Sequence, residues 1–453
     1  MHIIDSGELL PGAVLEADLC IVGTGPAGLT IARELAGLSR RFRIVMLESG
    51  GLHPDPWADA LGGIESVGAP RVMDQTLVRN RILGGTSSTW SGRAAVFDDT
   101  DFARRDWVPG SGWPIARDEV ARFFARSADH LGLGVDDNTA RGATAVVPAA
   151  FRALDADRLR GYVWSYSRDA SDRSDFMRFG PRAVAEGLGD IRVVTHATVT
   201  TVQTDAAASA ITGVEVSDRA GGRFRVVAPM VVLSAGAIEN ARLLLASDQV
   251  VPGGVGNRND LVGRYLMDHP RGPVAHFQPG DHLAAQRLFR GRRLDVGRGR
   301  ATATIGLALS PELQRREGLL NCAAWAARTV SDADPFVALG ALARRDGSPV
   351  GRAKQVLRGA GLLAEGALGV IGGRSPLRRV DELTLECMVE QRPDRDSRIM
   401  LADSRDALGV RRSRIDWRIS EQEALTVQRM RETVVAELGR LGLPVPRLSA
   451  DVV

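Results

Sequence analysis

The sequence predicts an α/β protein with two domains. Its 453 residues exceed what one hydrophobic core ordinarily serves. A buried-strand run, a glycine-rich turn and a helical run follow one another between residues 17 and 36, which is typical of a parallel sheet covered by helices. Short β-type runs between residues 191 and 228 predict an antiparallel meander attached to that sheet.

The composition is that of a globular chain, with 44% hydrophobic and 25% charged residues. The formal net charge of +3 gives no general case for nucleic-acid binding. No apolar run reaches the roughly 18–20 residues that a membrane span needs. Lys354 is the only lysine, which disfavours Schiff-base and pyridoxal chemistry.

The cysteines and the N-terminal residues bear on the cellular compartment. Cys20, Cys322 and Cys387 are far apart and form no CxxC pair, so neither a disulfide framework nor a zinc site is expected. The segment MHIIDSGELLPGAVLEADLC contains acids and no basic region, unlike a secretory signal. We therefore expect a soluble, cytoplasmic protein without a metal site.

The segment ADLCIVGTGPAGLTIARELA carries the pattern GxGxxG between a strand and a helix. Gly23 allows the tight turn, Gly25 lets the backbone approach a pyrophosphate, and Gly28 lets the helix pack closely on the strand. The helix N-terminus offers free N–H groups and a positive dipole end to phosphates. These residues predict a Rossmann-like dinucleotide site.

Glu48 ends the next buried strand, 20 residues after Gly28. A carboxylate there can accept hydrogen bonds from the two hydroxyls of a ribose, and it would repel a 2′-phosphate. The position favours FAD or NAD over NADP. A β-meander followed by the strand–turn–helix run at 231–247 is the layout of two-domain flavoproteins, whereas a nicotinamide dehydrogenase would continue with βαβ units.

Five segments resemble the glucose–methanol–choline (GMC) oxidoreductase family, in family order, within residues 15 to 440. RILGGTSSTWSG and SAGAIENARLLL are similar to the two family signatures, and VGRYLMDHP is similar to the family's Asp-His segment. WVPGSGWPI and DSRIMLADSRDALGVRRSRIDW resemble the bacterial, sugar-acting branch, the latter its substrate-domain strands.

The resemblance implies a bound FAD, with Val199 contacting the adenine through its backbone and the loop after Arg81 running along the flavin. Family members with covalent flavin have a histidine in this loop, and the matching residue here is Thr89, so we expect non-covalent FAD. The expected cofactor-binding residues are Gly23, Gly25, Pro26, Ala27, Gly28, Glu48, Ser49, Arg81, Gly84, Gly85, Thr86, Thr89, Trp90, Ser91, Val199, Ala235 and Asn240.

The resemblance also implies the domain division. Residues 1–102 and 186–268 are expected to form a discontinuous FAD-binding domain with a parallel sheet and a β-meander. Residues 103–185 and 269–453 are expected to form an α+β substrate-binding domain on a mostly antiparallel sheet, with a closing helix over 421–446. Within it, the Ala/Gly/Leu-rich segment 351–373 is expected to be a helix that covers this domain or, alternatively, lies on a membrane surface.

The family oxidises alcohols with a catalytic histidine in a C-terminal segment, yet no histidine of this sequence lies beyond His282. The segment is expected to be absent through truncation, supplied by a second polypeptide, or lost together with the usual chemistry. The catalytic residue is therefore unknown. His269 and His196 are expected to be structural, and Glu386 and Glu390 to pair with arginines, although a buried carboxylate there could act as a base.

The sequence thus predicts an FAD-dependent oxidoreductase that transfers hydride from an alcohol group of a sugar, glycoside or polyhydroxylated small molecule to the flavin. The competing hypothesis is an FAD-binding subunit or degenerate homologue that needs a partner chain or does not oxidise alcohols. The electron acceptor is left open.

Overall fold

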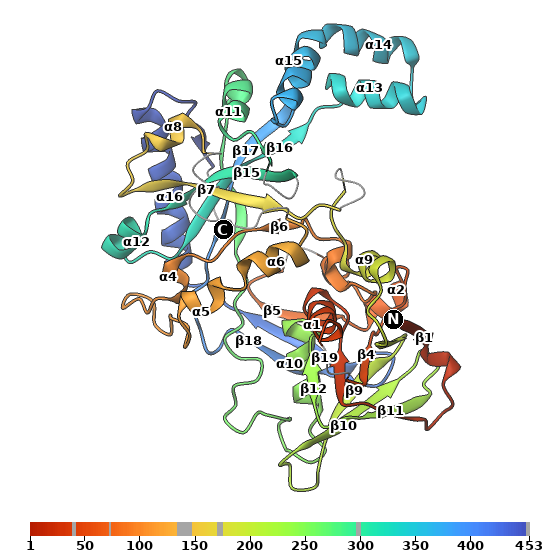
Figure 1. Cartoon of the computed structure of the whole chain (residues 1–453). Coiled ribbons are helices and arrows are strands. Elements are labelled where there is room, and N and C mark those ends of the chain that lie inside the picture. Colours follow the sequence, from red (N-terminus) through yellow and green to blue (C-terminus); the bar gives the residue numbers. More distant parts are fainter. Residues whose placement is uncertain (39–41, 72–73, 134–146, 170–174, 296–299, 450–453) are drawn as a thin grey trace. The chain divides into compact units, whose positions relative to one another are not determined.

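The computed structural model describes residues 1–38, 42–71, 74–133, 147–169, 175–295 and 300–449 (Figure 1). The chain divides into two compact units. The first unit comprises Met1–Gly92, Asp169–Leu266 and Asp394–Arg418. The second unit comprises Arg93–Arg168, Met267–Pro393 and Ile419–Val453.

These units differ from the expected domains chiefly in the segment 394–418, which the sequence places in the substrate-binding domain. In the structure this segment belongs to the first unit. Strand β19 (Arg411–Trp417) pairs in parallel with β5 (Ile64–Gly68) and antiparallel with β18 (Arg398–Arg405), which makes a three-stranded sheet. The backbone hydrogen bonds of this sheet hold 394–418 to the N-terminal part of the chain. Residues 169–185 also join the first unit, and 93–102 the second.

The first unit is built on a parallel sheet with the strand order β1-β8-β4-β3-β12. The strands are β1 (His2–Asp5), β8 (Arg192–Thr195), β4 (Ile44–Leu47), β3 (Leu19–Val22) and β12 (Val231–Leu233). Every residue of β3 and β4 is buried, as expected for all-apolar strands covered on both faces. Helix α1 (Pro26–Ala36) follows β3, and α10 (Ala237–Ala246) follows β12. The predicted Rossmann-like arrangement is confirmed.

The predicted meander forms the second sheet of this unit. Strands β9 (Thr198–Thr204), β10 (Ile211–Ser217) and β11 (Arg223–Val227) run antiparallel, and β2 (Val14–Glu16) pairs with β11 in parallel. Val202, Val214 and Val226 face inward and pack in one core with residues of β3 and β4. Alternation of apolar and polar residues along these strands accounts for this one-sided burial.

The second unit is built on an eight-stranded sheet with the order β20-β13-β17-β16-β15-β7-β6 and β14 beside β15. Its strands are β6 (Arg93–Ala94), β7 (Leu159–Tyr166), β13 (Arg271–His276), β14 (Arg292–Asp295), β15 (Arg300–Leu309), β16 (Cys322–Val330), β17 (Val380–Val389) and β20 (Arg447–Leu448). All described pairings in it are antiparallel, which confirms the predicted sheet type.

Helix α16 (Glu421–Arg440) packs on this sheet. Met430, Val434 and Leu438 are fully buried at a spacing of four residues, so they form one apolar stripe. Ser420 and Glu423 form a capping box that fixes where the helix begins. The predicted closing helix is therefore present.

Three further helices of the second unit, α13 (Pro335–Arg344), α14 (Pro349–Arg358) and α15 (Ala360–Ile371), are inserted between β16 and β17. The other α-helices of the described residues are α2 (Pro56–Ala60), α3 (Gln75–Val78), α4 (Asp99–Phe102), α5 (Arg117–Ala121), α6 (Phe124–His130), α8 (Ala149–Arg152), α9 (Phe179–Glu186), α11 (His282–Leu288) and α12 (Pro311–Glu317). In the described part of the chain, no helix has both the length and the apolar character needed to cross a bilayer.

A buried ion pair ties α10 to the turn between β18 and β19. The Nη2 atom of Arg242 lies 2.5 Å from Oδ2 of Asp406, and both side chains are almost fully buried. The same guanidinium donates to the carbonyl oxygens of Arg411 at 2.7 Å and Leu61 at 2.8 Å. Arg242 therefore connects three separate segments of the first unit.

We predict that Asp406→Ala lowers the free energy of unfolding by about 3–5 kcal/mol, because it removes the closer carboxylate of the buried Arg242 and leaves only Glu239, which also pairs with Arg79 and Arg81. Urea denaturation followed by circular dichroism measures the change. The matched control is Asp248→Ala, which removes the largely exposed partner of Arg411 and should cost at most about 1 kcal/mol. Equal losses of unfolding free energy in the two variants would contradict a stabilising role for the buried Arg242–Asp406 pair.

Candidate functional site

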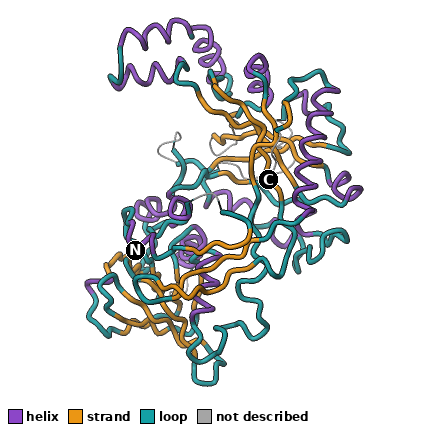
Figure 2. The backbone as a smooth tube through the Cα atoms, turned by 180° about the vertical axis from the view of Figure 1, so that it is seen from behind, coloured by secondary structure: helices purple, strands orange, loops and turns teal. Residues whose placement is uncertain are grey.

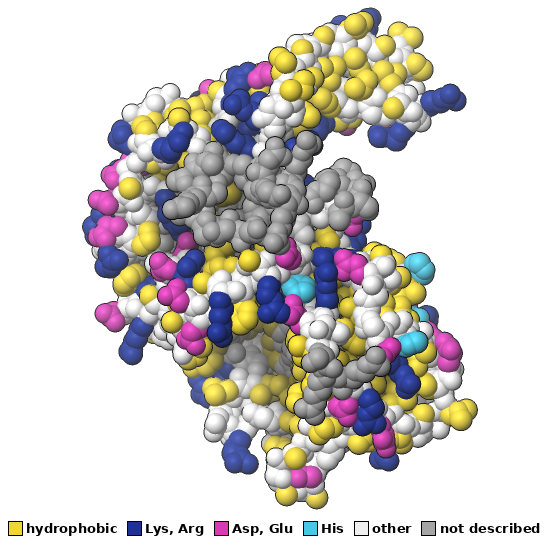
Figure 3. Space-filling view, in the orientation of Figure 1, with side chains coloured by type: hydrophobic (Ala, Val, Ile, Leu, Met, Phe, Trp, Pro, Cys, Tyr) yellow, Lys and Arg dark blue, Asp and Glu magenta, His cyan; other side chains and the backbone are white. Residues whose placement is uncertain are grey.

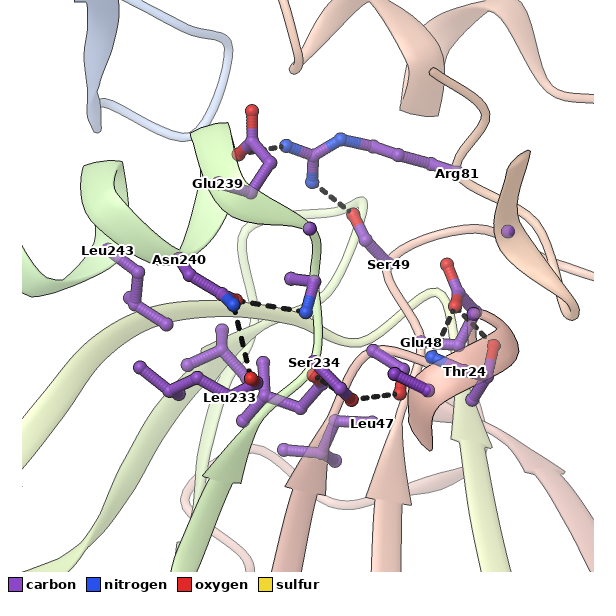
Figure 4. A pocket seen from close by; sticks show the side chains of 18 of the residues that line it. Thr24, Leu47, Glu48, Ser49, Arg81, Leu233, Ser234, Glu239, Asn240 and Leu243 are labelled. Atoms are coloured by element: carbon purple, nitrogen blue, oxygen red, sulfur yellow. Dashed lines mark hydrogen bonds and ion pairs between the residues drawn. The ribbon is translucent and has the colours of Figure 1, made fainter. Parts of the chain in front are cut away.

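A cavity of about 460 Å³ lies at the carboxyl edge of the parallel sheet in the first unit (Figure 4). It is surrounded by residues that follow β3, β4 and β12, by the start of β9, and by residues 80–86. The predicted residues that line it are Gly23, Gly25, Pro26, Ala27, Glu48, Ser49, Arg81, Gly85, Thr86, Val199, Ala235 and Asn240. The predicted residues outside its lining are Gly28, Gly84, Thr89, Trp90 and Ser91.

The loop after Arg81 leaves the cavity beyond Thr86. The Thr89 hydroxyl donates to Oδ1 of Asn80 at 2.6 Å, and Asn80 itself lines the cavity. The indole Nε1 of Trp90 donates to the carbonyl oxygen of Met177 at 3.0 Å. Thr89 and Trp90 therefore hold the loop in place, and the structure does not bring them to the cavity wall.

The turn between β3 and α1 is held by close backbone packing. Gly23 has φ +95°, a conformation that favours glycine. A Cβ atom on Gly28 would lie 2.2 Å from the carbonyl oxygen of Gly23 and 2.6 Å from the hydroxyl of Ser234, so only glycine fits there. Gly25 is the N-cap of α1 and provides no side-chain cap. The N–H groups of the first helical turn are thus left for a ligand at the cavity.

Glu48 is buried beside this turn. Its Oε2 atom accepts a hydrogen bond from the Thr24 backbone N–H at 3.2 Å and another from the Thr24 hydroxyl. Its Oε1 atom accepts from the Gly50 N–H at 2.9 Å. Burial raises the pKa of Glu48 above its ordinary value, although these hydrogen bonds and the charge of Arg81 oppose the rise.

The second turn, after β12, is joined to the first by Ser234. Its hydroxyl lies 2.8 Å from the carbonyl oxygens of both Val22 and Gly23. Asn240 then closes the turn, since its Oδ1 accepts from the Ala235 N–H at 2.9 Å and its Nδ2 donates to the Leu233 carbonyl at 3.1 Å (Figure 4). The two turns therefore form one continuous wall of the cavity.

An ionic cluster positions Arg81 at the cavity rim. Its Nη2 atom pairs with Oε2 of Glu239 at 2.8 Å, and its Nη1 donates to the Ser49 hydroxyl at 2.7 Å (Figure 4). Burial opposes the ionisation of Glu239, but the guanidinium groups of Arg81, Arg79 and Arg242 outweigh it and hold the pKa of Glu239 below its ordinary value. Glu239 therefore favours its ionised form and orients Arg81 through the ion pair.

Sequence reasoning missed several residues of the lining. Those with polar side chains are Thr24, Asn80, Thr198, Ser234 and Glu239. Ser234 and Glu239 stand inside a segment already singled out as a strand–turn–helix run, so their position after β12 was available as a signal. Thr24 lies inside the GxGxxG segment, but its contact with Glu48, like that of Thr198 with Ser49, depends on the folded sheet and has no local pattern.

These residues fit an FAD molecule at this edge of the sheet. The uncapped start of α1 suits a pyrophosphate, and the buried carboxylate of Glu48 suits ribose hydroxyls. Gly85 lies beside the first turn, since a Cβ atom on it would be 3.0 Å from Cα of Gly25. The loop and the turn therefore approach each other closely enough to enclose a phosphate-bearing ligand.

The two histidines that were considered as catalytic bases, His196 and His269, each lie beside an aspartate. His196 Nδ1 lies 2.5 Å from Oδ2 of Asp5 in the first unit. In the second unit, His269 is largely exposed and its Nδ1 lies 3.0 Å from Oδ1 of its neighbour Asp268.

The two carboxylates are each paired with an arginine. Glu386 pairs with Arg271 at 2.8 Å, and Glu390 pairs with Arg105 at 2.5 Å. Glu390 also accepts from the backbone N–H of Asn321 at 3.0 Å. This geometry supports a structural role for both.

We predict that Glu48 makes the ligand-free protein less stable as the pH rises above about 4.5. The folded state has a raised Glu48 pKa, so it keeps this proton at a pH where the unfolded chain has lost it. The free energy of unfolding should therefore fall between the ordinary and the raised pKa, and Glu48→Gln should flatten this slope. Urea titrations at several pH values compare the two proteins, and identical slopes would contradict the prediction.

Comparison with known proteins gives the following matches. Residues 63–271 match the family model described as GMC oxidoreductase. The chain is 25% identical over 312 residues to 2-methyl-1,2-propanediol dehydrogenase of Mycolicibacterium austroafricanum, which is 56% of this chain and 55% of that protein. It is 41% identical over 87 residues to the fructose dehydrogenase large subunit of Gluconobacter japonicus, which is 19% of this chain and 16% of that protein.

The matched part spans about half the length of the first relative and less of the second. Among solved structures, a formate oxidase of Aspergillus oryzae RIB40, studied for FAD modification, superposes with a TM-score of 0.50 at 14% identity. That match covers 97% of this chain and 84% of the oxidase and shows a shared fold. Residues 63–271, just under half of the chain, are thus identified as a region of the GMC oxidoreductase type.

Proposed function

We propose that this protein is an FAD-dependent oxidoreductase that oxidises an alcohol group of a small molecule. The observation that carries the proposal is the cavity wall formed by the two turns and Glu48, in a chain with a region of the GMC oxidoreductase type. When bound, FAD would accept a hydride from the carbon of a CH–OH donor.

Each element of the wall has a task in this proposal. The N–H groups at the start of α1, next to Gly25, would bind the pyrophosphate. Glu48 would accept hydrogen bonds from the adenosine ribose, and the backbone of Val199 would contact the adenine. Arg81, held by Glu239 and Ser49, would keep a positive charge at the rim beside the phosphates.

The same wall favours FAD over NADP. The carboxylate of Glu48 would repel a 2′-phosphate on the ribose, and hydrogen bonds from Thr24 and Gly50 fix its position.

The names of two relatives support the proposed substrate class. A propanediol dehydrogenase and a fructose dehydrogenase subunit both carry names of enzymes that act on hydroxylated small molecules. We therefore include sugars, glycosides and polyhydroxylated small molecules in the proposal. A partner subunit also belongs to it, since one relative is the large subunit of its enzyme.

We predict that the flavin is bound without a covalent bond. Thr89 offers no ring nitrogen for attachment, and its hydroxyl is engaged with Asn80. After acid precipitation of the protein, the yellow colour of the flavin should be found in the supernatant. A yellow precipitate would contradict the prediction.

The proposed activity predicts that the bound flavin bleaches in the absence of oxygen when a substrate alcohol is added. A panel of fructose, glucose and 1,2-diols should contain at least one compound that removes the yellow colour. The control is the same compound with its hydroxyls methylated, which cannot donate a hydride from a CH–OH carbon. A flavin that stays oxidised with the whole panel favours the FAD-binding subunit without alcohol oxidation.

A further inference from the structure

Helices α13, α14 and α15 form an arm that leaves the sheet of the second unit between β16 and β17. The arm comprises Pro335–Arg344, Pro349–Arg358 and Ala360–Ile371. It extends away from the strands in both views of the backbone (Figures 1 and 2). The segment 351–373 was expected to be a helix that covers the domain or, alternatively, a helix on a membrane surface.

Gly366 and Gly369 of α15 face the rest of the second unit. A Cβ atom on Gly366 would lie 2.4 Å from Cζ of Phe336, and one on Gly369 would lie 2.0 Å from Nη2 of Arg290. Both glycines are buried. The side of α15 that carries these two glycines is therefore filled by its contacts with Phe336 of α13 and with Arg290.

Two helices of the arm carry exposed apolar side chains. Leu368 and Ile371, three residues apart on α15, are 70% and 84% exposed. Val350 and Leu357, two turns apart on α14, are 76% and 75% exposed. Because residues at these spacings share one side of a helix, each helix presents an apolar stripe. Figure 3 shows hydrophobic side chains gathered over the arm.

Basic residues accompany these stripes. The charged residues of the arm and its connecting turns are Arg344, Arg345, Asp346, Arg352, Lys354, Arg358 and Glu365. Five are basic and two acidic, whereas the whole chain is nearly balanced. Lys354 and Arg358 are exposed and lie beside Leu357 on α14. Glu365 is paired with Arg287 at 3.1 Å, so its charge is offset.

The arm is too short to cross a bilayer. At about 1.5 Å per residue, the 12 residues of α15 span about 18 Å, and a hydrocarbon core is about 30 Å thick. A short apolar stripe with basic neighbours is instead the pattern of a helix that lies in the membrane interface, where Lys and Arg reach the phosphates.

We propose that the arm docks on an anionic lipid surface, with Val350, Leu357, Leu368 and Ile371 in the interface and Lys354 and Arg358 at the headgroups. Charge complementarity selects this occupant. In a twofold contact the same surface of each copy faces the other, so a dimer through this arm would bring the basic residues of two chains together. The negative headgroups of an anionic bilayer would instead attract Lys354 and Arg358.

The test is co-sedimentation of the full chain with phosphatidylcholine vesicles that contain about 30% phosphatidylglycerol, compared with pure phosphatidylcholine. The protein should bind the anionic vesicles and leave them when salt is raised from about 0.05 to about 0.5 M, because the Debye length shortens. Sedimentation velocity of the protein alone, at the same concentrations, should show no self-association through this face.

Two variants test the named residues. Lys354→Gln with Arg358→Gln should weaken binding roughly 25-fold, since each basic residue near an anionic surface contributes about fivefold. Leu357→Ser with Leu368→Ser and Ile371→Ser should abolish binding. The matched controls are Arg223→Gln with Arg258→Gln, and Leu10→Ser, which alter exposed residues of the first unit. All variants should keep the wild-type circular dichroism and melting temperature.

The proposal is overturned if the protein does not sediment with anionic vesicles, or if the arm variants and the control variants bind these vesicles equally well. It is also overturned if the protein forms a dimer that the arm variants dissociate, because the face would then be an interface between copies.

Discussion

The contact of Gly28 with Gly23 and Ser234 is the constraint on which the cavity depends. No side chain fits at position 28, because a Cβ atom would overlap the Gly23 carbonyl. The N-terminus of α1 can therefore lie directly at the end of β3, and Ser234 can join the turns after β3 and β12. Parallel pairing of β3 with β4 and β12 then brings Glu48 and Ala235 to the same edge. The chemistry proposed for the site needs this convergence.

A second constraint is the cluster of ion pairs around Arg242 and Glu239. Arg242 contacts Glu239 at 3.3 Å and Asp406 at 2.5 Å, and Glu239 in turn pairs with Arg81 at the cavity rim. The position of Arg81 thus depends on a turn more than 300 residues later in the chain. Low exposure makes these pairs sensitive to the loss of either partner. The ionic cluster therefore links the fold of the 394–418 segment to the geometry of the site.

The sequence predicted those parts of the molecule that local pattern determines. The Gly23–Gly28 turn, the buried strands and helix α16 follow from short-range spacing, and the structure contains them. The pairing of β19 with β5 was not predictable, because it joins residues about 350 positions apart and no local pattern records it. The role of Glu239 in binding Arg79 and Arg81 was missed for a similar reason, since these two arginines lie about 160 residues earlier in the chain. The exposed face of the arm likewise required the structure, because an apolar helix in sequence is equally consistent with burial.

The central claim is that the two turns and Glu48 form one FAD site. The most direct measurement is a titration of the flavin-free chain with FAD, followed by flavin fluorescence, for the wild-type protein and for Gly28→Val. The account predicts saturation at one FAD per chain for the wild type and loss of binding in the variant, with circular dichroism showing that both are folded. A folded wild-type chain that binds no FAD, or a Gly28→Val chain that binds it equally well, would contradict the account.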